Sequence, residues 1–253
     1  MKPALSLYAI PDLPPIEPGT DLATIIADGI EQAGLEPRSG DAIAIAQKIV
    51  SKADGRFVDL NTVKPSARAL ELAGQAEKDP RVVEVILSES RRVVRHRPGV
   101  IIVEHRLGLI LANAGIDRSN VGAGDDVVLL LPEDPDDSAR QLRQRLEARF
   151  GARLGVLITD SLGRPWRMGT TGVAIGCAGV PVLEDLRGKP DLFGRLLEVS
   201  EVATADSVAA ACGLLMGEGA EGCPVILLRG LDAGASAQSA TDVLRPVPED
   251  LFR

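Results

Sequence analysis

Aromatic side chains and surplus positive charge are both scarce in this chain of 253 residues. Phe, Tyr and Trp together make up 2% of the sequence, and 28 Lys and Arg residues stand against 36 Asp and Glu residues, which gives a formal net charge of −8. Proteins that bind nucleic acid rely on clustered positive charge and on aromatic rings that stack against bases. We therefore expect no nucleic-acid partner, and any anionic ligand would be held by local basic residues or metal ions.

Cysteine, long apolar runs and the common nucleotide motifs are lacking as well. Cys177, Cys212 and Cys223 are odd in number and far apart, which excludes a disulfide framework and a structural zinc site. No apolar run reaches the roughly 18 residues of a membrane span, and residues 1–13 lack the pattern of a secretory signal peptide. We expect a cytoplasmic protein with no membrane partner. No Walker-type loop, Gly-x-Gly-x-x-Gly or Gly-x-Ser-x-Gly occurs, so any nucleotide would be bound on another scaffold.

Segments with helical spacing of apolar residues alternate irregularly with short β-branched segments. The spacing predicts helices at residues 21–33, 66–75, 80–95, 135–150 and 206–216. Strands are expected at 5–9, 41–50, 56–60, 100–104, 109–113, 127–131, 154–159, 173–175, 197–202 and 225–228, with 41–50 and 56–60 joined as one hairpin and 100–104 and 109–113 as another. This mixture predicts an α+β fold with mixed or antiparallel sheets. Disorder is expected only at residues 232–241, which are rich in Gly, Ala and Ser.

Two acidic residues, each accompanied by an amide or a hydroxyl, follow apolar runs. Asp117 lies in Asn113-Ala114-Gly115-Ile116-Asp117, and Asp160 is followed directly by Ser161. Magnesium prefers oxygen ligands, usually one or two carboxylates with phosphate and water. The pattern suggests carboxylates gathered at one edge of a sheet around a divalent metal, although capping of turns is the commoner role for residues such as Asp117 and Asp160. Glu218, in Met216-Gly217-Glu218-Gly219, could join them, although glycine after a helix is also an ordinary helix end.

Basic residues that could hold phosphate are Lys52, at the end of an apolar segment, and Arg164 and Arg167, which follow Asp160. An exposed surface position is the commoner situation for each of them. Trp166 is expected to be buried, although it could stack on a ligand ring. His96 is interpreted as a solvated residue near a helix end. His105 could act as a base but has no ligand or carboxylate partner at a suitable spacing, and Cys177 and Cys212 are expected to serve packing.

Taken together, the motifs resemble one enzyme family. They are Gln47-Lys48-Ile49-Val50-Ser51-Lys52, Ala112-Asn113-Ala114-Gly115-Ile116-Asp117 with Ser119-Asn120, Thr159-Asp160-Ser161 with Gly163-Arg164 and Trp166-Arg167, Ala174-Ile175-Gly176, and Leu215-Met216-Gly217-Glu218-Gly219. In this order, from Leu13 to Arg229 and on to Asp250-Leu251-Phe252, the chain resembles the coenzyme F420-0:L-glutamate ligases, or γ-glutamyl ligases.

The resemblance implies a GTP-dependent ligase that adds L-glutamate, through an acyl phosphate, to a deazaflavin coenzyme precursor. It also implies Mg²⁺ or Mn²⁺, two ions in number, together with K⁺ in many members. The small-molecule substrates would be the partners, and the α+β chain would be one subunit of an intertwined homodimer. Residues 1–253 would form a single γ-glutamyl ligase unit of two lobes, whose boundary stays open, without the flavin-binding domain fused to some bacterial relatives.

Carried over position by position, the resemblance implies the residues of the site. Asp117, Asp160, Ser161 and Glu218 would bind the metals, and Leu13, Pro14, Pro15, Ile16, Gln47, Lys48, Lys52, Asn120 and Met216 would contact GTP. Asp117, Asp160, Arg164 and Arg167 would serve the chemistry, the two arginines by our own hypothesis that they bind phosphate or the acidic precursor. Gln47 departs from the His or Ser of many relatives, and Ser161 from the usual Thr.

Three other functions remain open at this point. A ligase of the same chemistry that acts on another cofactor would carry the same metal and GTP residues. A metal-dependent phosphohydrolase would release phosphate from nucleotide without glutamate. A non-catalytic nucleotide-binding subunit is the third, and the set of Asp117, Asp160 and Glu218 counts against it.

Overall fold

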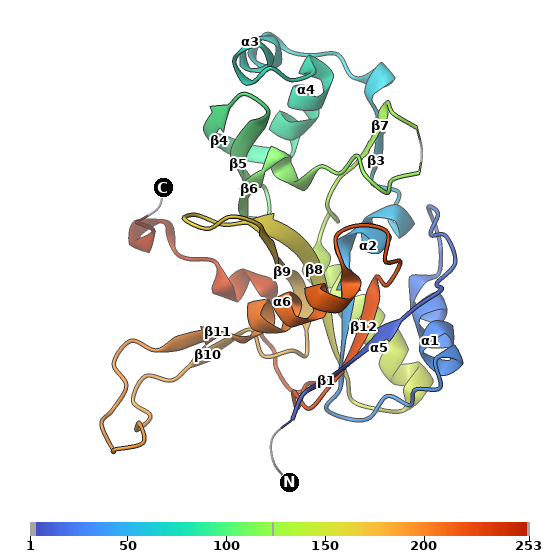
Figure 1. The fold of residues 1–253 in the computed structure, drawn as a ribbon, viewed down its shortest axis with the longest axis vertical. Helices are drawn as coiled ribbons and strands as arrows, with labels where there is room; N and C mark the ends of the chain where they lie inside the picture. The colour runs from blue at the N-terminus through green and yellow to red at the C-terminus, as the bar shows by residue number, and fades with distance from the viewer. Residues whose placement is uncertain (1–3, 123, 252–253) are drawn as a thin grey trace.

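A five-stranded sheet forms the centre of the computed structural model, which describes residues 4–122 and 124–251 (Figure 1). Its strands, in spatial order, are β1 (Ser6–Ile10), β12 (Val225–Arg229), β2 (Ala42–Ala46), β8 (Gly155–Gly163) and β9 (Thr170–Ala178). Only β2 and β8 run parallel, and every other pair is antiparallel. Residues 1–3 of the amino-terminal segment discussed above, and Phe252, lie outside the described residues.

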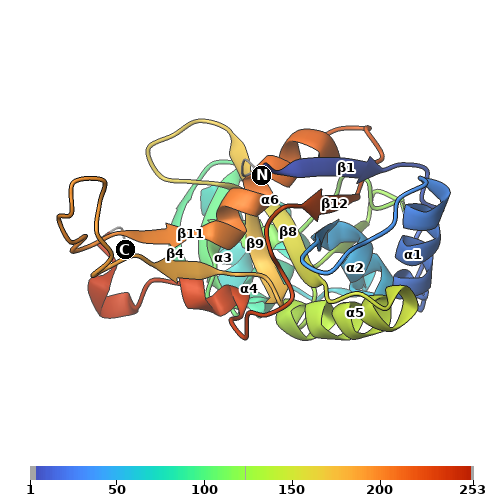
Figure 2. The same ribbon diagram turned by 90° about the horizontal axis from the view of Figure 1, so that it is seen from below.

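Helices cover both faces of this sheet, as Figure 2 shows from below. The helices are α1 (Leu22–Gln32), the short α2 (Gln47–Ala53), α5 (Pro135–Phe150) and α6 (Thr204–Met216). Side chains alternate between the faces of a strand, so the isoleucines of β2 join α1, α2 and α5 in one core, while its alanines join α6 in another. The small residues on the α6 side allow a close approach: a Cβ at Gly172 would lie 2.4 Å from the Ala209 carbonyl oxygen.

Residues from the segment 58–130 form a third hydrophobic core, in the part of the molecule at the top of Figure 1. It is built by α3 (Ala67–Ala76), α4 (Pro80–Ser88) and a three-stranded antiparallel sheet of β4 (Ser90–Arg97), β5 (Val100–His105) and β6 (Ile110–Ala112). Beside it, β3 (Phe57–Asp59) pairs with β7 (Val127–Leu129). The separate core supports the expected second lobe, and that division of the chain stays a prediction.

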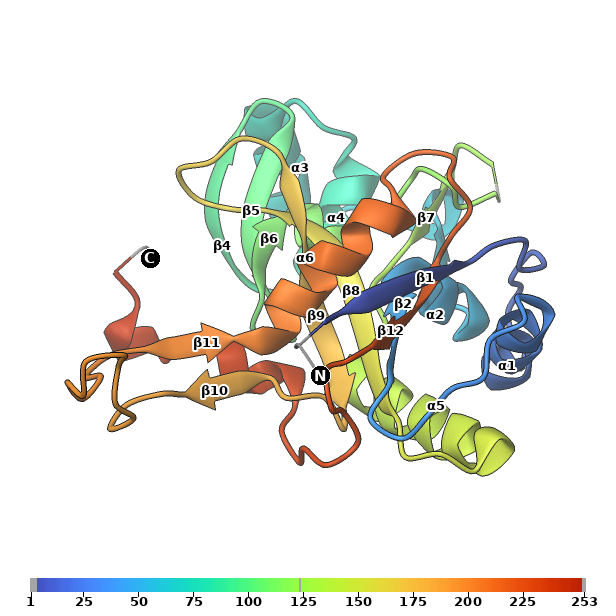
Figure 3. The ribbon, with the colours of Figure 1, turned by 60° about the horizontal axis from the view of Figure 1, so that its bottom comes forward.

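A two-stranded arm projects from the body of the molecule (Figure 3). It consists of β10 (Leu183–Asp185), β11 (Glu201–Ala203) and the loop between them. The exposed fractions of Leu192, Phe193 and Val199 are 97%, 95% and 84%. A two-stranded hairpin has little stability of its own in water, so this arm presents an apolar surface that its own chain does not cover.

The α+β architecture with mixed and antiparallel sheets confirms the predicted fold class. No described helix is long and apolar enough to cross a lipid bilayer. Cys177 and Cys212 are buried, as expected for packing residues, and burial raises the pKa of both thiols, that of Cys212 to about 12.

Several predicted elements were wrong. The expected strand 41–50 ends at Ala46, and α2 follows; its hairpin with 56–60 does not form, because β3 pairs with β7 instead. The helix expected to reach residue 95 ends at Ser88, and β4 contains His96, so His96 lies on a strand. A short segment rich in β-branched residues fits both the helical repeat and the alternation of a strand. Spacing alone therefore did not separate helix from strand in these segments.

Three further expectations are corrected at the surface and at a strand end. Trp166, expected to be buried, is 87% exposed. Residues 232–241, expected to be disordered, pack against the body: Ala233 and Ala240 are buried, and Ser236 pairs with Gly179. Asp160 does not follow its strand but lies within β8, which continues to Gly163.

Candidate active site

A pocket of about 570 Å³ opens beside the start of α2, which follows β2, and the carboxyl-terminal half of β8. Because these two strands are parallel, their carboxyl ends point to the same edge of the sheet, and Ala46 lies opposite Thr159. Ligands of α/β sheets commonly bind in the crevice at such an edge. The predicted residues that line it are Leu13, Pro14, Pro15, Ile16, Gln47, Lys48, Lys52, Asp117, Asn120, Asp160, Ser161, Met216 and Glu218.

A strained turn brings Asp117 to the pocket. Asn113, Ala114 and Gly115 have positive φ angles of 52°, 55° and 66°, a conformation that Gly and Asn tolerate and Ala disfavours. Asn113 Oδ1 accepts a hydrogen bond from the Ile101 amide at 3.1 Å, which holds the turn against β5. The Asp117 backbone then exchanges two hydrogen bonds with Leu129, which fixes its position beside β7.

Two residues of α2 engage the carboxylate of Asp117. Gln47 Nε2 donates a hydrogen bond of 2.8 Å to Asp117 Oδ2. Lys48 Nζ lies 3.4 Å from Asp117 Oδ1 and donates to the Ser119 carbonyl at 3.1 Å. Burial raises the pKa of Asp117, while the positive charge of Lys48 and the hydrogen bonds from Lys48 and Gln47 oppose that rise.

Asp160 is the most strongly perturbed acid of the pocket. A register shift between Ile158 and Thr159, directly before it, interrupts the pairing of β8 with β9, and such bulges often aim a side chain at a functional site. Burial raises the pKa of Asp160 to about 7, and the negative charges of Asp117 and Glu218 add to this effect. The site therefore concentrates negative charge that a bound cation would relieve.

The loop after α6 closes another side of the pocket. Ser161 Oγ donates a hydrogen bond of 2.5 Å to Glu218 Oε1, which links β8 to this loop. Asn120 Nδ2 donates to the Gly219 carbonyl at 3.1 Å. Glu221, within the loop, accepts from the Gly219 amide at 2.8 Å, so the loop is held by its own side chain as well as by Ser161 and Asn120.

The donors in the pocket fit a hard divalent cation. Among residues 4–122 and 124–251, no three His, Cys, Asp or Glu side chains lie together at the spacing of a complete ligand set for one ion. Magnesium, however, usually takes one or two carboxylates and completes its coordination with phosphate and water. Asp117 and Asp160 are carboxylates of that kind, since each lines the pocket and Asp160 is surrounded by negative charge.

Comparison with known proteins identifies the family of this chain. Residues 12–230 match the family model described as F420-0:Gamma-glutamyl ligase. The chain belongs to this family. It is 47% identical over 255 residues to the coenzyme F420:L-glutamate ligase of Methanopyrus kandleri, covering 99% of this chain and 98% of the relative. The proteins of the same name from Methanothermobacter thermautotrophicus and Archaeoglobus fulgidus are 42% and 39% identical, each over 98% of this chain and over 99% and 96% of the relatives.

Two residues predicted to act in this γ-glutamyl ligase are not brought to the pocket. Arg164 and Arg167 lie in the exposed turn between β8 and β9, and Arg164 Nη1 donates to the Gly169 carbonyl at 3.5 Å. A strand rises about 3.3 Å per residue, so Arg164 lies well beyond Asp160 along the extended chain. Their binding of phosphate or precursor stays a prediction.

His105, considered as a base, lies in the third core region instead. It is fully buried, its Nδ1 accepts from the Leu107 amide, and its Nε2 is 3.5 Å from Glu89 Oε2. That distance is long for a hydrogen bond but short enough for electrostatic attraction. His105 is therefore part of a structural network and lines no part of the pocket.

The pocket also contains residues to which the sequence patterns assigned no role at the site, among them Ser119, Thr159, Gly172 and Cys223. Thr159 and Ser119 stand beside Asp160 and Asn120 in the motifs, so the motifs themselves were a usable signal. Gly172 and Cys223 lie two and four residues outside the quoted motifs, and the fold brings them to the site.

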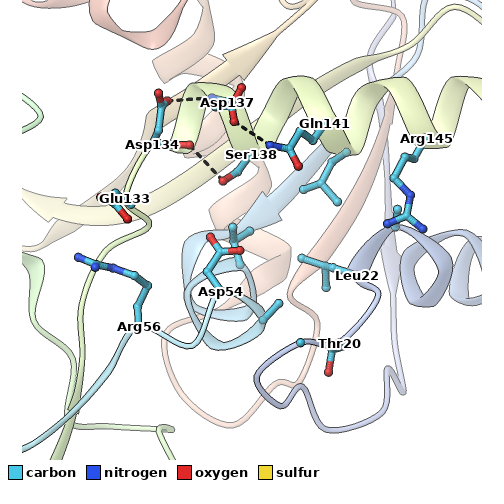
Figure 4. A pocket seen from close by; sticks show the side chains of 15 residues that line it. Thr20, Leu22, Asp54, Arg56, Glu133, Asp134, Asp137, Ser138, Gln141 and Arg145 are labelled. Atoms are coloured by element: carbon cyan, nitrogen blue, oxygen red, sulfur yellow. Dashed lines mark hydrogen bonds between the residues drawn. The ribbon is translucent and has the colours of Figure 1, made fainter.

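A second cavity, of about 480 Å³, lies on the other side of α2, between α1 and α5 (Figure 4). Several of its polar groups are hydrogen-bonded to one another. Asp134 Oδ1 accepts from the Asp137 amide, Ser138 Oγ donates to the Asp134 carbonyl, and Gln141 Nε2 donates to Asp137 Oδ2. These contacts begin α5 in the manner of a helix cap, so we assign the reaction to the pocket at the β2–β8 edge.

Proposed function

We propose that this protein is a GTP-dependent ligase that joins L-glutamate to coenzyme F420-0. Family membership supports the reaction, since the relatives named above are coenzyme F420:L-glutamate ligases. The observation that carries the proposal is the pocket itself, in which Asp117, Asp160 and Glu218 meet Lys48 and Lys52. Carboxylates for cations and lysines for phosphate are what a phosphoryl-transfer site needs.

The metal ions, Mg²⁺ or Mn²⁺, would be held by Asp117, Asp160, Ser161 and Glu218. These ions would neutralise the negative charge of the phosphate groups during phosphoryl transfer. The contacts of these side chains support the assignment: Ser161 contacts Glu218, and Gln47 and Lys48 contact Asp117. Cation binding requires the charged form of Asp160, so it competes with the proton that the raised pKa retains.

The nucleotide would lie between the loop of residues 13–16, α2 and the loop after α6. Lys52 is partly buried, and burial together with the nearby charge of Lys48 lowers its pKa. Two like charges side by side favour an anionic ligand between them. Asn120 and Met216 line the same space and supply further contacts.

The ligation would proceed in two steps, formation of an acyl phosphate and then formation of the amide. The acceptor carboxylate attacks the γ-phosphorus of GTP, the bond to the β-phosphate oxygen breaks, and an acyl phosphate and GDP form. The amine of L-glutamate then attacks the acyl carbon, phosphate leaves, and the surplus amine proton passes to solvent. The main contribution of the pocket residues is to align the reactants, which supplies about 7–11 kcal/mol in well-aligned cases.

A mass-spectrometric assay with purified protein, GTP, Mn²⁺, L-glutamate and F420-0 tests the proposal. We expect the acceptor mass to rise by glutamyl steps, and Asp160→Ala to lower the rate by about 100-fold or more. Asp28→Asn is the control, because Asp28 lies on the surface of α1, where it pairs with Arg149 at 3.3 Å, and surface pairs contribute little. GTP hydrolysis without glutamate would instead indicate a phosphohydrolase, and ligation only to another acceptor would indicate a related ligase.

The subunit arrangement belongs to the same proposal. The apolar residues of the arm between β10 and β11 are almost fully exposed, and a second copy of the chain would bury them. The chain resembles ligases that form intertwined homodimers. In such a dimer, the arm would be the element that packs against the second subunit. We propose a homodimer on this basis.

A further inference from the structure

Two buried polar side chains of α2 connect in a line to the pocket. Ser51 is fully buried and Gln47 is 3% exposed. Ser51 Oγ donates a hydrogen bond of 2.9 Å to Gln47 Oε1, one helical turn away, and Gln47 Nε2 donates to Asp117 Oδ2. Buried polar groups are costly unless they are hydrogen-bonded, so three polar groups in a line call for an explanation.

The chemistry of the partners fixes the direction of this line. A charged carboxylate only accepts hydrogen bonds, so Gln47 must turn its amide nitrogen toward Asp117. Its amide oxygen is then left facing the interior, where an unsatisfied acceptor is unfavourable. The Ser51 hydroxyl donates to that oxygen, and the amide is held in one of its two orientations.

The hydrogen bond from Gln47 engages only one of the two carboxylate oxygens of Asp117. Oδ2 is occupied by Gln47, whereas Oδ1 lies 3.4 Å from the charged nitrogen of Lys48. Gln47 is neutral, so it orients the carboxylate without neutralising it. The remaining charge attracts the ammonium group of Lys48 in this structure, and a bound cation would take the place of Lys48 at Oδ1.

We propose that Ser51 and Gln47 are positioning residues, which hold the Asp117 carboxylate so that Oδ1 is presented to the cation of the ligase site. The proposal rests on the proposed function, because it assigns Asp117 to metal binding. It explains why a glutamine suits position 47: its amide can accept from Ser51 and donate to Asp117 at the same time. Ser51 itself touches neither cation nor substrate and acts through Gln47.

The test measures Mn²⁺ binding to the full chain by titration calorimetry, with thermal unfolding to confirm that each variant is folded. Groups that orient a metal ligand typically contribute about 10- to 100-fold in metal affinity. We expect Gln47→Met to weaken Mn²⁺ binding within that range and Ser51→Ala to weaken it by a smaller factor. Ser51→Thr keeps the hydroxyl and should restore most of the affinity.

A double-mutant cycle tests whether Ser51 acts through Gln47. In the Gln47→Met background, Ser51→Ala should cause no further loss of Mn²⁺ affinity. The matched control is Ser88→Ala on α4, where the hydroxyl donates to the Val85 carbonyl far from the pocket, and Mn²⁺ affinity should be unchanged.

The outcomes separate this inference from the proposed function. Unchanged Mn²⁺ affinity in Gln47→Met, or an equal loss from Ser51→Ala in both backgrounds, would overturn the positioning role while wild-type ligation stands. A wild-type protein that neither binds Mn²⁺ nor ligates glutamate would overturn both. In the ligase assay, we expect the same variants to raise the KM for Mn²⁺ more than they lower kcat.

Discussion

At the scale of single residues, Asp160 shows how an active site works against stability. Its pKa rises from 3.8 to about 7, chiefly through burial. A carboxyl group with a raised folded-state pKa binds more protons in the folded protein, so its contribution to stability declines as pH rises from about 4 through about 7. At neutral pH and above, the charged, partly buried carboxylate is a cost that the function requires.

Asp160→Asn should remove this cost. Without divalent cations, we expect the variant to be more stable than the wild type by about 1–2 kcal/mol near pH 8, and the difference should shrink as pH falls toward about 4. Thermal unfolding measured across this pH range checks the expectation. A stability difference that did not change with pH would show that Asp160 keeps an ordinary pKa.

Residue-scale features of the site were the most predictable from the sequence. Asp117, Asp160 and Glu218 each lie in a compact motif, and the pocket gathers all three. The hydrogen bond from Gln47 to Asp117 was not predictable, because it joins residues 70 positions apart. The prediction that Trp166 is buried was wrong. A large aromatic ring is buried on average, whereas Trp166 lies in the exposed turn between β8 and β9.

At the scale of elements, the first turn of α5 joins three parts of the fold. Asp134 caps the helix by accepting from the Asp137 amide. Asp136 Oδ1 accepts from the amides of Cys177, on β9, and Ala240, at 2.8 and 2.9 Å. The same carboxylate therefore fastens the sheet and the segment once expected to be disordered.

Asp136→Ala should leave two backbone amides without an acceptor. We expect a loss of about 1–3 kcal/mol in the free energy of unfolding, measured by urea denaturation, and Asp136→Asn should recover most of it because the amide retains an oxygen. Asp137→Ala, next in the chain and 45% exposed where it pairs with Arg140, is the control and should cost less than about 1 kcal/mol. Equal losses at both positions would argue against the joining role.

Element prediction succeeded where signals were redundant. The helix at 135–150 has a cap, a proline in its first turn and a glycine at its end, and its bounds were predicted correctly. The segment after Ala46 lacks such start signals: α2 begins without a side-chain cap, and it contains the β-branched residues Ile49 and Val50. Its helical state depends on packing against the sheet, which local spacing does not report.

At the scale of the whole molecule, one buried acid ties the third core to the chain that leads into α5. Glu89 lies 3.1 Å from Arg56, 3.0 Å from Arg106 and 3.5 Å from His105. Arg56 and Arg106 also donate to the carbonyls of Leu131 and Glu133. Burial opposes the charge of Glu89, yet the neighbouring His105, Arg106 and Arg56 outweigh it and lower its pKa to about 2.

This network predicts a specific acid sensitivity. Because the pKa of Glu89 is lowered in the folded protein, its charged form stabilises the fold. This contribution is fully present above pH 4.5 and is lost as the pH falls toward about 2. Glu89→Gln should cost about 1.5–3 kcal/mol at neutral pH, and the gap between variant and wild type should close through that acidic range. Denaturant titrations at several pH values measure it, and a gap that persisted at the acidic end would contradict the assignment.

The arm gives a prediction about assembly. Replacing Leu192 and Phe193 with serine should shift the protein from dimer to monomer, because both side chains are more than nine-tenths exposed in the single chain and their burial would stabilise the dimer by about 1.5–3 kcal/mol each. Analytical ultracentrifugation measures the shift. Leu70→Ser, on α3 and 56% exposed, is the control. A wild-type protein that sediments as a monomer would refute the homodimer.

The order of the central sheet has a consequence for how the chain is made. β12 lies between β1 and β2, so Ser6 pairs with Arg229 and Ile43 pairs with Leu227. During synthesis, β1 and one edge of β2 must wait until nearly the whole polypeptide has left the ribosome. Such distant pairing is slow and leaves strand edges open to aggregation. A nascent chain arrested before residue 225 could therefore form the core of its α3–α4 region, while its central sheet would lack β12 and the pairing of β1.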